Sequence, residues 1–276
     1  MKRIPLLITA SLDPGETPLV ALRDVRQRTL RHMEGLIAWL RDPSVERVVF
    51  AKNCALPIRT EVLLRLAACY RKELEFVQVA SSPLTPRQGK GHGEGDLIRQ
   101  ALDKSEVLRA ARDFIKVTGK LYMPEASSVF TGEGDGEFFV ATIHDKAPVF
   151  PLRHLVRGAY RDETLGMALF MMRKFRIPWE WIAAVPSGWI DTRCYRCGTR
   201  YYRDHLLHTH KRVRDALGYT LENAVFDDLA GSKDIRRIKS DPIIQGMSGS
   251  LGTNSGSFSE DILHEAADLT DRLLSH

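Results

Sequence analysis

The stretch RQGKGHGEGDLIRQALDKSEVLRAARDFIKVTGKLY, residues 87–122, decides the fold. It opens with a glycine-rich segment, residues 89–95, that carries Lys90, His92 and Glu94. A run with apolar residues at three- and four-residue spacing follows and predicts a helix; residues 114–118 then predict a strand. Glycine lets a ligand approach the backbone closely, and free N–H groups at a helix N-terminus attract anions. We therefore expect a nucleotide-binding part of an α/β sheet here.

The first eighty residues alternate between strand and helix patterns, which is typical of a parallel sheet with right-handed crossovers. Ligands bind such sheets at the carboxyl ends of the strands. The residues expected at that edge are Thr9, Ser11, Asp13, Lys52, Asn53 and the glycine-rich segment. The pattern predicts strands at 4–10, 45–50 and 74–79, and helices at 20–40 and 60–71.

The second half of the chain is less regular, and no internal repeat or linker divides it. We expect a single domain, residues 1–276, with a nucleotide-binding half at 1–122 and an acceptor-side half with a C-terminal elaboration at 123–276. Expected elements are a loop at 129–136, a strand at 138–143, a helix at 161–176, a strand within 181–192, helices at 202–217 and 219–229, a Gly/Ser-rich loop at 246–257 and an amphipathic helix at 262–273.

Composition describes a soluble globular protein with a mildly basic balance. The 276 residues include 40 Lys+Arg and 35 Asp+Glu, a net charge of +5. This balance suits phosphate-bearing ligands or an anionic membrane surface but is too dispersed to indicate nucleic acid. No apolar run approaches the roughly 18 residues of a membrane helix, and four cysteines do not make a disulfide scaffold at this length. We expect a cytoplasmic protein.

The glycine-rich segment is neither a Walker A motif, since no Gly-Lys-Ser/Thr closes it, nor a dinucleotide fingerprint. It is a flexible connection or a phosphate site. The following strand places Lys116 and Thr118 on one face, with Lys120 just beyond. That alternation fits a half-exposed edge strand, or cationic side chains that hold a pyrophosphate where many sugar-nucleotide enzymes have metal-binding carboxylates.

Cys194 and Cys197 form a CxxC pair followed by His205 and His210. Together they have the residue types of a tetrahedral zinc site. No histidine lies three to five residues beyond His210, so the spacing is not that of a C2H2 finger. An accidental CxxC is the alternative.

Residues 191–193 and 210–222 combine basic and acidic side chains. They are either a solvated helical face with ordinary ion pairs or a sugar-binding wall. In the second interpretation Arg193, His210 and Arg212 contact phosphate or sugar. A carboxylate, Glu222, Asp215 or Asp191, then accepts the proton of an attacking hydroxyl.

Gly246–Gly252 superficially resembles a serine-hydrolase elbow, but the spacing around Ser248 is wrong for one. A loop that closes over a substrate and a disordered segment remain open alternatives.

Taken in order, LLITASLDP, VVFAKN, GKGHGEG, FIKVTGK, DTR at 191–193, HKRVRDALGYTLE at 210–222 and GMSGSLG at 246–252 resemble a family of bacterial surface-polysaccharide (lipopolysaccharide and capsule) glycosyltransferase-like proteins. The resemblance covers most of the chain. The family has Glu-Asn where Lys52-Asn53 stands, arginine where Lys120 stands, and aromatic residues in place of the CxxC.

The resemblance implies an α/β, Rossmann-like GT-A-type fold, with a mostly parallel sheet flanked by helices, that transfers a sugar from a nucleotide donor to a hydroxyl of a surface glycan. We expect a nucleotide sugar and a glycan or lipid-linked acceptor as partners, and no nucleic acid. We also expect transfer to need no metal, because no Asp-x-Asp follows the strand at 114–118. The terminal helix suggests contact with the inner face of a membrane. The expected nucleotide-sugar-binding residues are Thr9, Ser11, Asp13, Asn53, Lys90, Gly91, Gly93, Glu94, Lys116, Thr118, Lys120, Arg193, His210, Arg212 and Ser248.

Two alternatives belong to other classes. One is a non-catalytic binding module stabilised by zinc at Cys194, Cys197, His205 and His210. The other is a sugar nucleotidyltransferase on the same fold. Such an enzyme is expected to have a glycine-rich loop directly after the first strand, and this sequence lacks that loop.

Overall fold

Near-continuous apolar segments form the central sheet because both of its faces are covered. The computed structural model describes residues 4–17, 20–130, 138–144, 188–215, 219–238, 242–247 and 256–275. Within them the main sheet has seven strands in the order β10-β6-β9-β4-β1-β2-β3. The strands are β1 (Leu6–Ala10), β2 (Arg47–Lys52), β3 (Glu73–Gln78), β4 (Asp113–Thr118), β6 (Phe139–Ala141), β9 (Cys194–Gly198) and β10 (Ile235–Arg237).

The sheet is mostly parallel, as expected. β1 lies between β2 and β4, with Ile8 opposite Phe50 on one side and Val117 on the other, both in parallel register. β9 is antiparallel to β4 and to β6, and β10 returns to parallel pairing with β6. Two small antiparallel pairs lie outside the main sheet: β5 (Leu121–Tyr122) with β11 (Gln245–Gly246), and β7 (Ile143–His144) with β8 (Trp189–Ile190).

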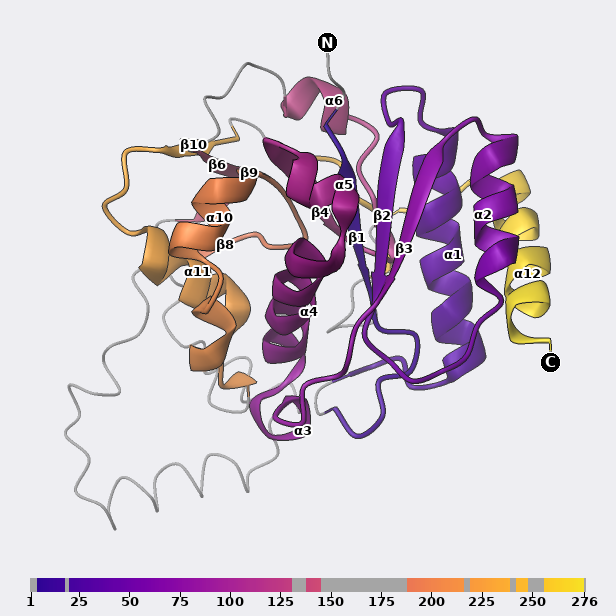
Figure 1. Cartoon of the computed structure of the whole chain (residues 1–276), viewed down its shortest axis with the longest axis horizontal. Helices are drawn as coiled ribbons and strands as arrows, with labels where there is room; N and C mark the ends of the chain where they lie inside the picture. Colours follow the sequence, from indigo (N-terminus) through magenta and orange to yellow (C-terminus); the bar gives the residue numbers. More distant parts are fainter. Residues whose placement is uncertain are drawn as a thin grey trace.

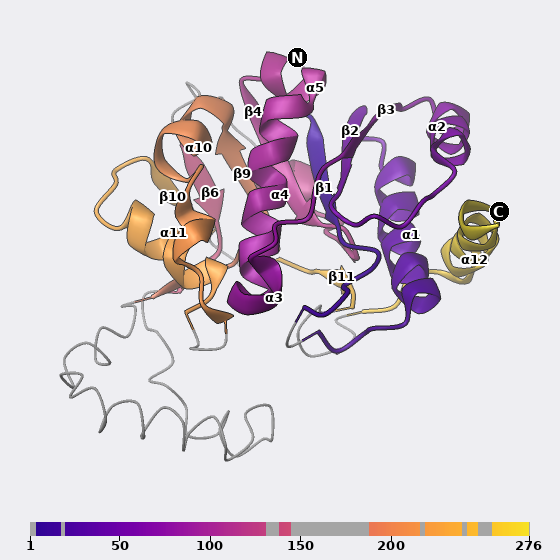
Figure 2. The ribbon, with the colours of Figure 1, turned by 60° about the horizontal axis from the view of Figure 1, so that its bottom comes forward.

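Helices cover both faces of the sheet (Figure 1). One face packs against α1 (Val25–Arg41), α2 (Thr60–Cys69) and α12 (Glu260–Leu274). The other packs against α4 (Lys90–Lys104), α5 (Glu106–Ala110), α10 (Thr199–His205) and α11 (Leu221–Leu229). Figure 2 shows α4 beside α10 and α11, with α1 and α12 together on the other side. The remaining short elements are α3 (Thr85–Gln88), α6 (Ala126–Val129) and the 3-10 helix η1 (Thr209–Arg212).

Helix α1 follows from local sequence signals. Asp24 caps it by accepting a hydrogen bond from the Gln27 N–H at 2.7 Å. Met33, Leu36 and Ile37 recur at helical spacing and are fully buried against the sheet. This packing holds the helix beneath the ends of β1 and β4.

Three sequence expectations need correction. The glycine-rich segment is not a loop, because α4 begins at Lys90 and contains Gly91, Gly93 and Gly95 in its first turns. The sequence predicts no strand at the CxxC, but Cys194–Gly198 form β9. The helix expected at 202–217 ends at His205, and η1 follows it. The helix expected at 161–176, the loop expected at 129–136 beyond residue 130 and most of the loop at 246–257 lie outside the described residues.

The expected terminal helix is present as α12. Its apolar residues Ala266, Leu269 and Leu273 are buried in the same core as α1. The apolar face is therefore used inside the protein, which removes the reason for expecting it to contact a membrane. No helix in the described ranges is both long and apolar enough to cross a bilayer.

Candidate functional site

The carboxyl ends of β1, β2 and β4 meet at one edge of the sheet and bring several of the predicted site residues together. The Asn53 N–H donates to the Ala10 carbonyl at 3.3 Å, and the Gly119 N–H donates to the Thr9 carbonyl at 2.9 Å. These bonds hold together the chain segments that follow β1, β2 and β4. Such an edge is where α/β sheets bind ligands.

Glu94 of α4 is the centre of a hydrogen-bond network at this edge. Its Oε1 accepts from the hydroxyl of Thr9 at 3.2 Å, from the hydroxyl of Thr118 at 3.0 Å and from Lys116. Burial by itself raises the pKa of Glu94, but the Lys116 ammonium, the charge of Lys90 and the Thr118 hydroxyl together outweigh it and hold that pKa below its ordinary value. Glu94 is thus a carboxylate fixed between α4, β1 and β4.

Lys116 is completely buried, and its ammonium is held from three sides. Besides the ion pair with Glu94, its Nζ donates to the Thr118 hydroxyl at 3.0 Å and to the Thr192 carbonyl at 2.6 Å. An ammonium has three donors. Lys116 therefore positions Glu94 and the chain at Thr192.

Lys120, four residues further on, has the opposite environment. Its side chain is 2% exposed, and no described residue accepts a hydrogen bond from its Nζ. Burial lowers the pKa of Lys120 to about 7, with further lowering by the charges of Arg28 and Lys90 that the Glu94 carboxylate does not offset. A buried cation beside other cations is costly unless an anion compensates it.

Two residues of α1 lie beside Lys120, and the sequence did not reveal them: Arg28, which forms a cationic cluster with Lys120 and Lys90, and the neutral His32. Arg28 is buried and donates to the Ser11 carbonyl and, at 3.1 Å, to the Leu22 carbonyl. Burial, with the charges of Lys120 and Arg28, lowers the pKa of His32 well below its ordinary value, so His32 is neutral. Within the predicted helix at 20–40 only their position on its apolar stripe distinguishes them from ordinary surface residues.

Asn53, Ser11 and Asp13 line the same edge on the β2 side and in the loop after β1. Asn53 is 9% exposed, and its Oδ1 has no hydrogen-bond partner among the described residues. Ser11 Oγ donates to the Asp13 carbonyl at 3.3 Å, and the Asp13 carboxylate accepts from the Gly15 N–H at 2.8 Å. Asn53 thus presents a buried acceptor next to the cationic cluster.

The predicted residues of the second half approach the network through Thr192. Its hydroxyl donates to Glu222 Oε1 at 3.1 Å, at the start of α11. Asp191 forms a bidentate ion pair with Arg193, with contacts of 2.7 and 3.0 Å. Glu222 is therefore connected to Glu94 through Thr192 and Lys116.

Asp215 closes the N-terminus of α4. Its Oδ2 accepts from the Gly91 N–H at 3.0 Å, and burial raises its pKa. A Cβ at Gly91 would lie 3.2 Å from Asp215 and 3.1 Å from Leu221. The glycines thus let the second half of the chain pack closely on α4, and a protein carboxylate occupies part of the N-terminal anion position.

His210 and Arg212 do not reach this edge. Both belong to η1, which packs against α4; His210 faces Asp96, and Arg212 pairs with Asp228 at 2.5 Å. Gly93 lies inside α4 and faces the Thr85 side chain. Ser248 lies outside the described residues.

The zinc arrangement suggested by the sequence is not formed. Cys194 and Cys197, three residues apart on β9, belong to the cores on opposite faces of the sheet. His205 ends α10 and His210 lies in η1. In the described ranges no group of three or more His, Cys, Asp or Glu side chains is placed to hold a metal ion.

The sheet and its helices have the Rossmann-like GT-A fold that the sequence predicts. The galactosyltransferase LgtC, solved in complex with donor and acceptor sugar analogues, has the same fold: the TM-score is 0.53 at 7% identity, over 99% of this chain and 97% of that one. Two weaker likenesses have TM-scores below 0.5 and carry no weight. They are the bifunctional glycosyltransferase WbbM (TM-score 0.44, 9% identity, 85% of this chain but 38% of that one) and the core-mannan synthase CmsA/Ktr4 from Aspergillus fumigatus in its Mn/GDP form (0.46, 10%, 98% and 84%). No protein-family profile matches the sequence, and no curated protein matches it significantly.

Proposed function

We propose that this protein is a glycosyltransferase that moves a sugar from a nucleotide donor to a hydroxyl of a surface-glycan acceptor. The observation that carries the proposal is the buried Lys120 ammonium, which no described residue pairs, beside Arg28 and Lys90 at the carboxyl edge of the sheet. A diphosphate supplies the negative charge that this cluster requires. The fold and the resemblance in sequence point to the same class of donor.

The donor would lie across the ends of β1 and β2. Its diphosphate contacts Lys120 and Lys90, and its base or ribose donates a hydrogen bond to the unpaired Asn53 Oδ1. Residues 1–122 thus form the donor half, and Asp191, Arg193 and Glu222 lie on the acceptor side. Lys116 and the threonines hold Glu94 beside the transferred sugar.

Transfer needs a proton acceptor and stabilisation of the leaving group. The acceptor oxygen forms a bond to the anomeric carbon, while the bond from that carbon to the diphosphate breaks and its electron pair leaves with the phosphate. Glu222 takes the proton of the attacking hydroxyl, with Asp191 as the alternative base. The charges of Lys120 and Lys90 stabilise the departing diphosphate.

The first test is a thermal-shift screen of the purified chain against UDP, GDP, CMP, dTDP and their sugar conjugates, each with Mn²⁺ and with a chelator. A ligand that binds the folded state raises its melting temperature. We expect a shift with one nucleotide diphosphate and its sugar conjugate that persists in chelator. No shift with any of them contradicts the proposal; a shift that requires Mn²⁺ contradicts only its metal-free form.

Lys120→Met tests the phosphate site, and Lys233→Met, at an exposed lysine, is the matched control. Removing a buried, unpaired charge leaves the unliganded protein as stable as before or more so, because the desolvation cost disappears. We expect the nucleotide-induced shift to be lost in Lys120→Met alone. An unchanged shift in Lys120→Met would place the diphosphate elsewhere.

A further inference from the structure

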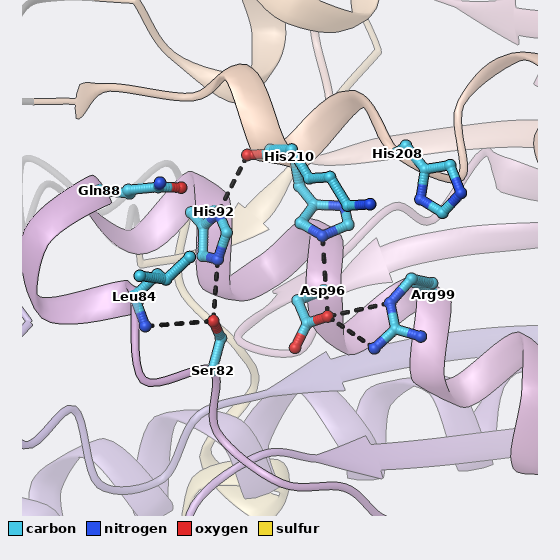
Figure 3. Close-up of a pocket in the computed structure, with 9 residues that line it drawn as sticks. Ser82, Leu84, Gln88, His92, Asp96, Arg99, His208 and His210 are labelled. Carbon is cyan, nitrogen blue, oxygen red and sulfur yellow. Dashed lines mark hydrogen bonds and ion pairs between the residues drawn. The ribbon is translucent and has the colours of Figure 1, made fainter.

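A cavity of about 490 Å³ is lined by one face of α4 (Figure 3). Its wall comes from α4 (His92, Asp96, Arg99), from η1 and the residue before it (His208, His210), and from the segment leading into α3, which contributes Leu84. At 3.6 residues per turn, His92, Asp96 and Arg99 share one face of α4, while Glu94 lies about 200° around the helix from His92. The cavity is thus separate from the proposed donor site, and its volume is within the range of small-molecule sites.

The cavity wall is built by a chain of fixed hydrogen bonds. His92 donates from Nδ1 to the His210 carbonyl at 3.0 Å, which leaves its Nε2 to accept from the Ser82 hydroxyl at 2.9 Å. Asp96 accepts two hydrogen bonds from Arg99, at 2.9 and 3.0 Å, and one from Gln100 at 2.8 Å. The polar groups of the wall are therefore held in place, and the one carboxylate among the lining residues is occupied.

Two acceptor atoms of the lining residues remain unsatisfied. His210 is 4% exposed, and burial lowers its pKa to about 4, so its ring is neutral. The negative charge of Asp96, whose Oδ1 lies 3.7 Å from Nε2, favours the proton on that nitrogen and leaves Nδ1 as an acceptor. Nδ1 of His210 and Oε1 of Gln88 have no hydrogen-bond partner among the described residues, and Figure 3 shows the Gln88 amide directed toward His92.

These groups define the chemistry of an occupant. Two buried acceptors favour an occupant with O–H or N–H donors, since buried polar groups in native proteins are paired with protein, ligand or ordered water. The Arg99 and Lys211 side chains on the same wall offer N–H donors, so the ligand must also accept. A carboxylate or a fully ionised phosphate ester has no donor for His210 and Gln88, and an ammonium has no acceptor for Arg99 and Lys211. Hydroxyl groups satisfy both requirements, and Leu84, 44% exposed, offers an apolar surface to sugar C–H groups.

We propose that this cavity is a saccharide subsite that binds a unit of the acceptor glycan remote from the point of transfer. The assignment to the acceptor rests on the proposed function. The Glu94 side and the cavity side of α4 adjoin the same N-terminal turns of this helix, where the Gly91 N–H donates to Asp215. In this proposal the glycan crosses that end of the helix from the donor site to the cavity.

The test measures saccharide binding to the full chain by NMR, in the absence of nucleotide. The probes are D-galactose, D-glucose and N-acetyl-D-glucosamine, with inorganic phosphate as the anionic comparison. We expect one or more sugars to shift the Gln88 side-chain amide and His210 ring signals with a Kd of about 1–10 mM, typical of a weak single-unit contact. Signals that respond only to phosphate, or to none of the probes, overturn the proposal.

Leu84→Arg places a long side chain at the cavity, and Leu64→Arg, at a leucine of α2 that is 46% exposed, is the matched control. Leu84→Arg should weaken sugar binding at least about tenfold, a 1.4 kcal/mol change, while Leu64→Arg leaves it unchanged. Equal sugar affinity in the two variants overturns the proposal. The nucleotide-induced thermal shift is measured on the same samples. If the unaltered protein shows no such shift, the transferase function is refuted. If it shows the shift but binds no sugar, only the subsite is refuted.

Discussion

At the scale of single residues, the candidate site depends on two lysines, Lys116 and Lys120, that lie four residues apart in the sequence and have opposite environments in the fold. Lys116 is neutralised by Glu94, whereas Lys120 lies among cations with no hydrogen-bond acceptor in the described part of the chain. The sequence predicts that both lie at the carboxyl edge of a strand. The sequence does not reveal that their environments differ. That difference depends on which residue of α4 contacts Lys116, and on the position of Arg28 and His32 of α1 beside Lys120.

Lys120 predicts that ligand binding is coupled to proton uptake. Burial and nearby cations lower its pKa from 10.5 to about 7, so at pH 8 most of the free protein has a neutral Lys120. A bound diphosphate favours the charged form and raises that pKa. Calorimetry of nucleoside diphosphate binding at pH 8, in buffers of different ionisation enthalpy, should show the uptake of about one proton.

The same pKa fixes the direction of a stability change. Between pH 7 and 10.5 the unfolded chain holds a proton on Lys120 that the folded protein has lost, so this residue makes the fold more stable as pH rises through that window. Lys120→Met should abolish both the proton uptake and this contribution to the slope. Proton uptake that persists in Lys120→Met would assign the titration to another group.

At the scale of elements, glycines determine how closely the helices approach the site. The sequence shows the cluster at 89–95 and suggests a ligand loop, but the structure uses Gly91 and Gly95 for packing of α4 against Asp215, Leu221 and His210. The alternation of apolar and polar residues does not distinguish these uses, because a partner distant in sequence decides between them. Helix α1 has a similar position at Gly35, inside an ordinary amphipathic pattern.

Gly35→Ala should destabilise the fold although alanine is the better helix former. A Cβ at Gly35 would lie 2.6 Å from the Gly119 carbonyl oxygen and 3.2 Å from the Leu121 nitrogen, and these backbone atoms are harder to displace than the end of a side chain. We expect a loss of about 1–3 kcal/mol in the free energy of unfolding, measured by urea denaturation, and a weaker nucleotide shift because Lys120 is displaced.

Gly93→Ala is the comparison on α4. There the atoms nearest to the Cβ would be those of the Thr85 side chain, at 2.9 Å, and a side chain is more easily moved than backbone. Its cost should be smaller than that of Gly35→Ala. Equal costs would mean that the 119–121 segment moves freely and that α1 does not fix Lys120.

At the scale of the whole molecule, the alternation of strand and helix patterns predicted the β1-β2-β3 half well, because each element there carries its own apolar period. The other half was harder to predict. Strand β9 inserts antiparallel between β4 and β6, and its sequence CYRCG is buried on both faces, with Arg196 paired to Asp113 at 2.6 Å. A buried arginine inside a short run with two cysteines has no strand periodicity, and its partner lies 83 residues away.

For the amphipathic C-terminal helix, periodicity predicts the helix but not the partner of its apolar face. It correctly predicts α12, but an apolar face is equally suited to a membrane and to another helix. In the structure the partner of α12 is α1. Arg41 of α1 pairs with Asp261 at 2.6 Å and with Glu265 at 2.7 Å, and Leu269 and Leu273 of α12 are buried in the same core as α1. α12 thus closes the core under α1.

Leu269→Ala distinguishes the two roles. If α12 belongs to the core, the substitution leaves a cavity against α1 and lowers the free energy of unfolding by about 2–4 kcal/mol, whereas His264→Ala, at an exposed position of the same helix, changes it little. Urea denaturation measures both, and cosedimentation with anionic vesicles is measured alongside. A membrane role for this face predicts the reverse, namely unchanged unfolding and weaker vesicle binding in Leu269→Ala. Because α1 also presents Arg28 and His32 to the site, a core role for α12 further implies that Leu269→Ala lowers nucleotide binding only at temperatures where the fold itself begins to open.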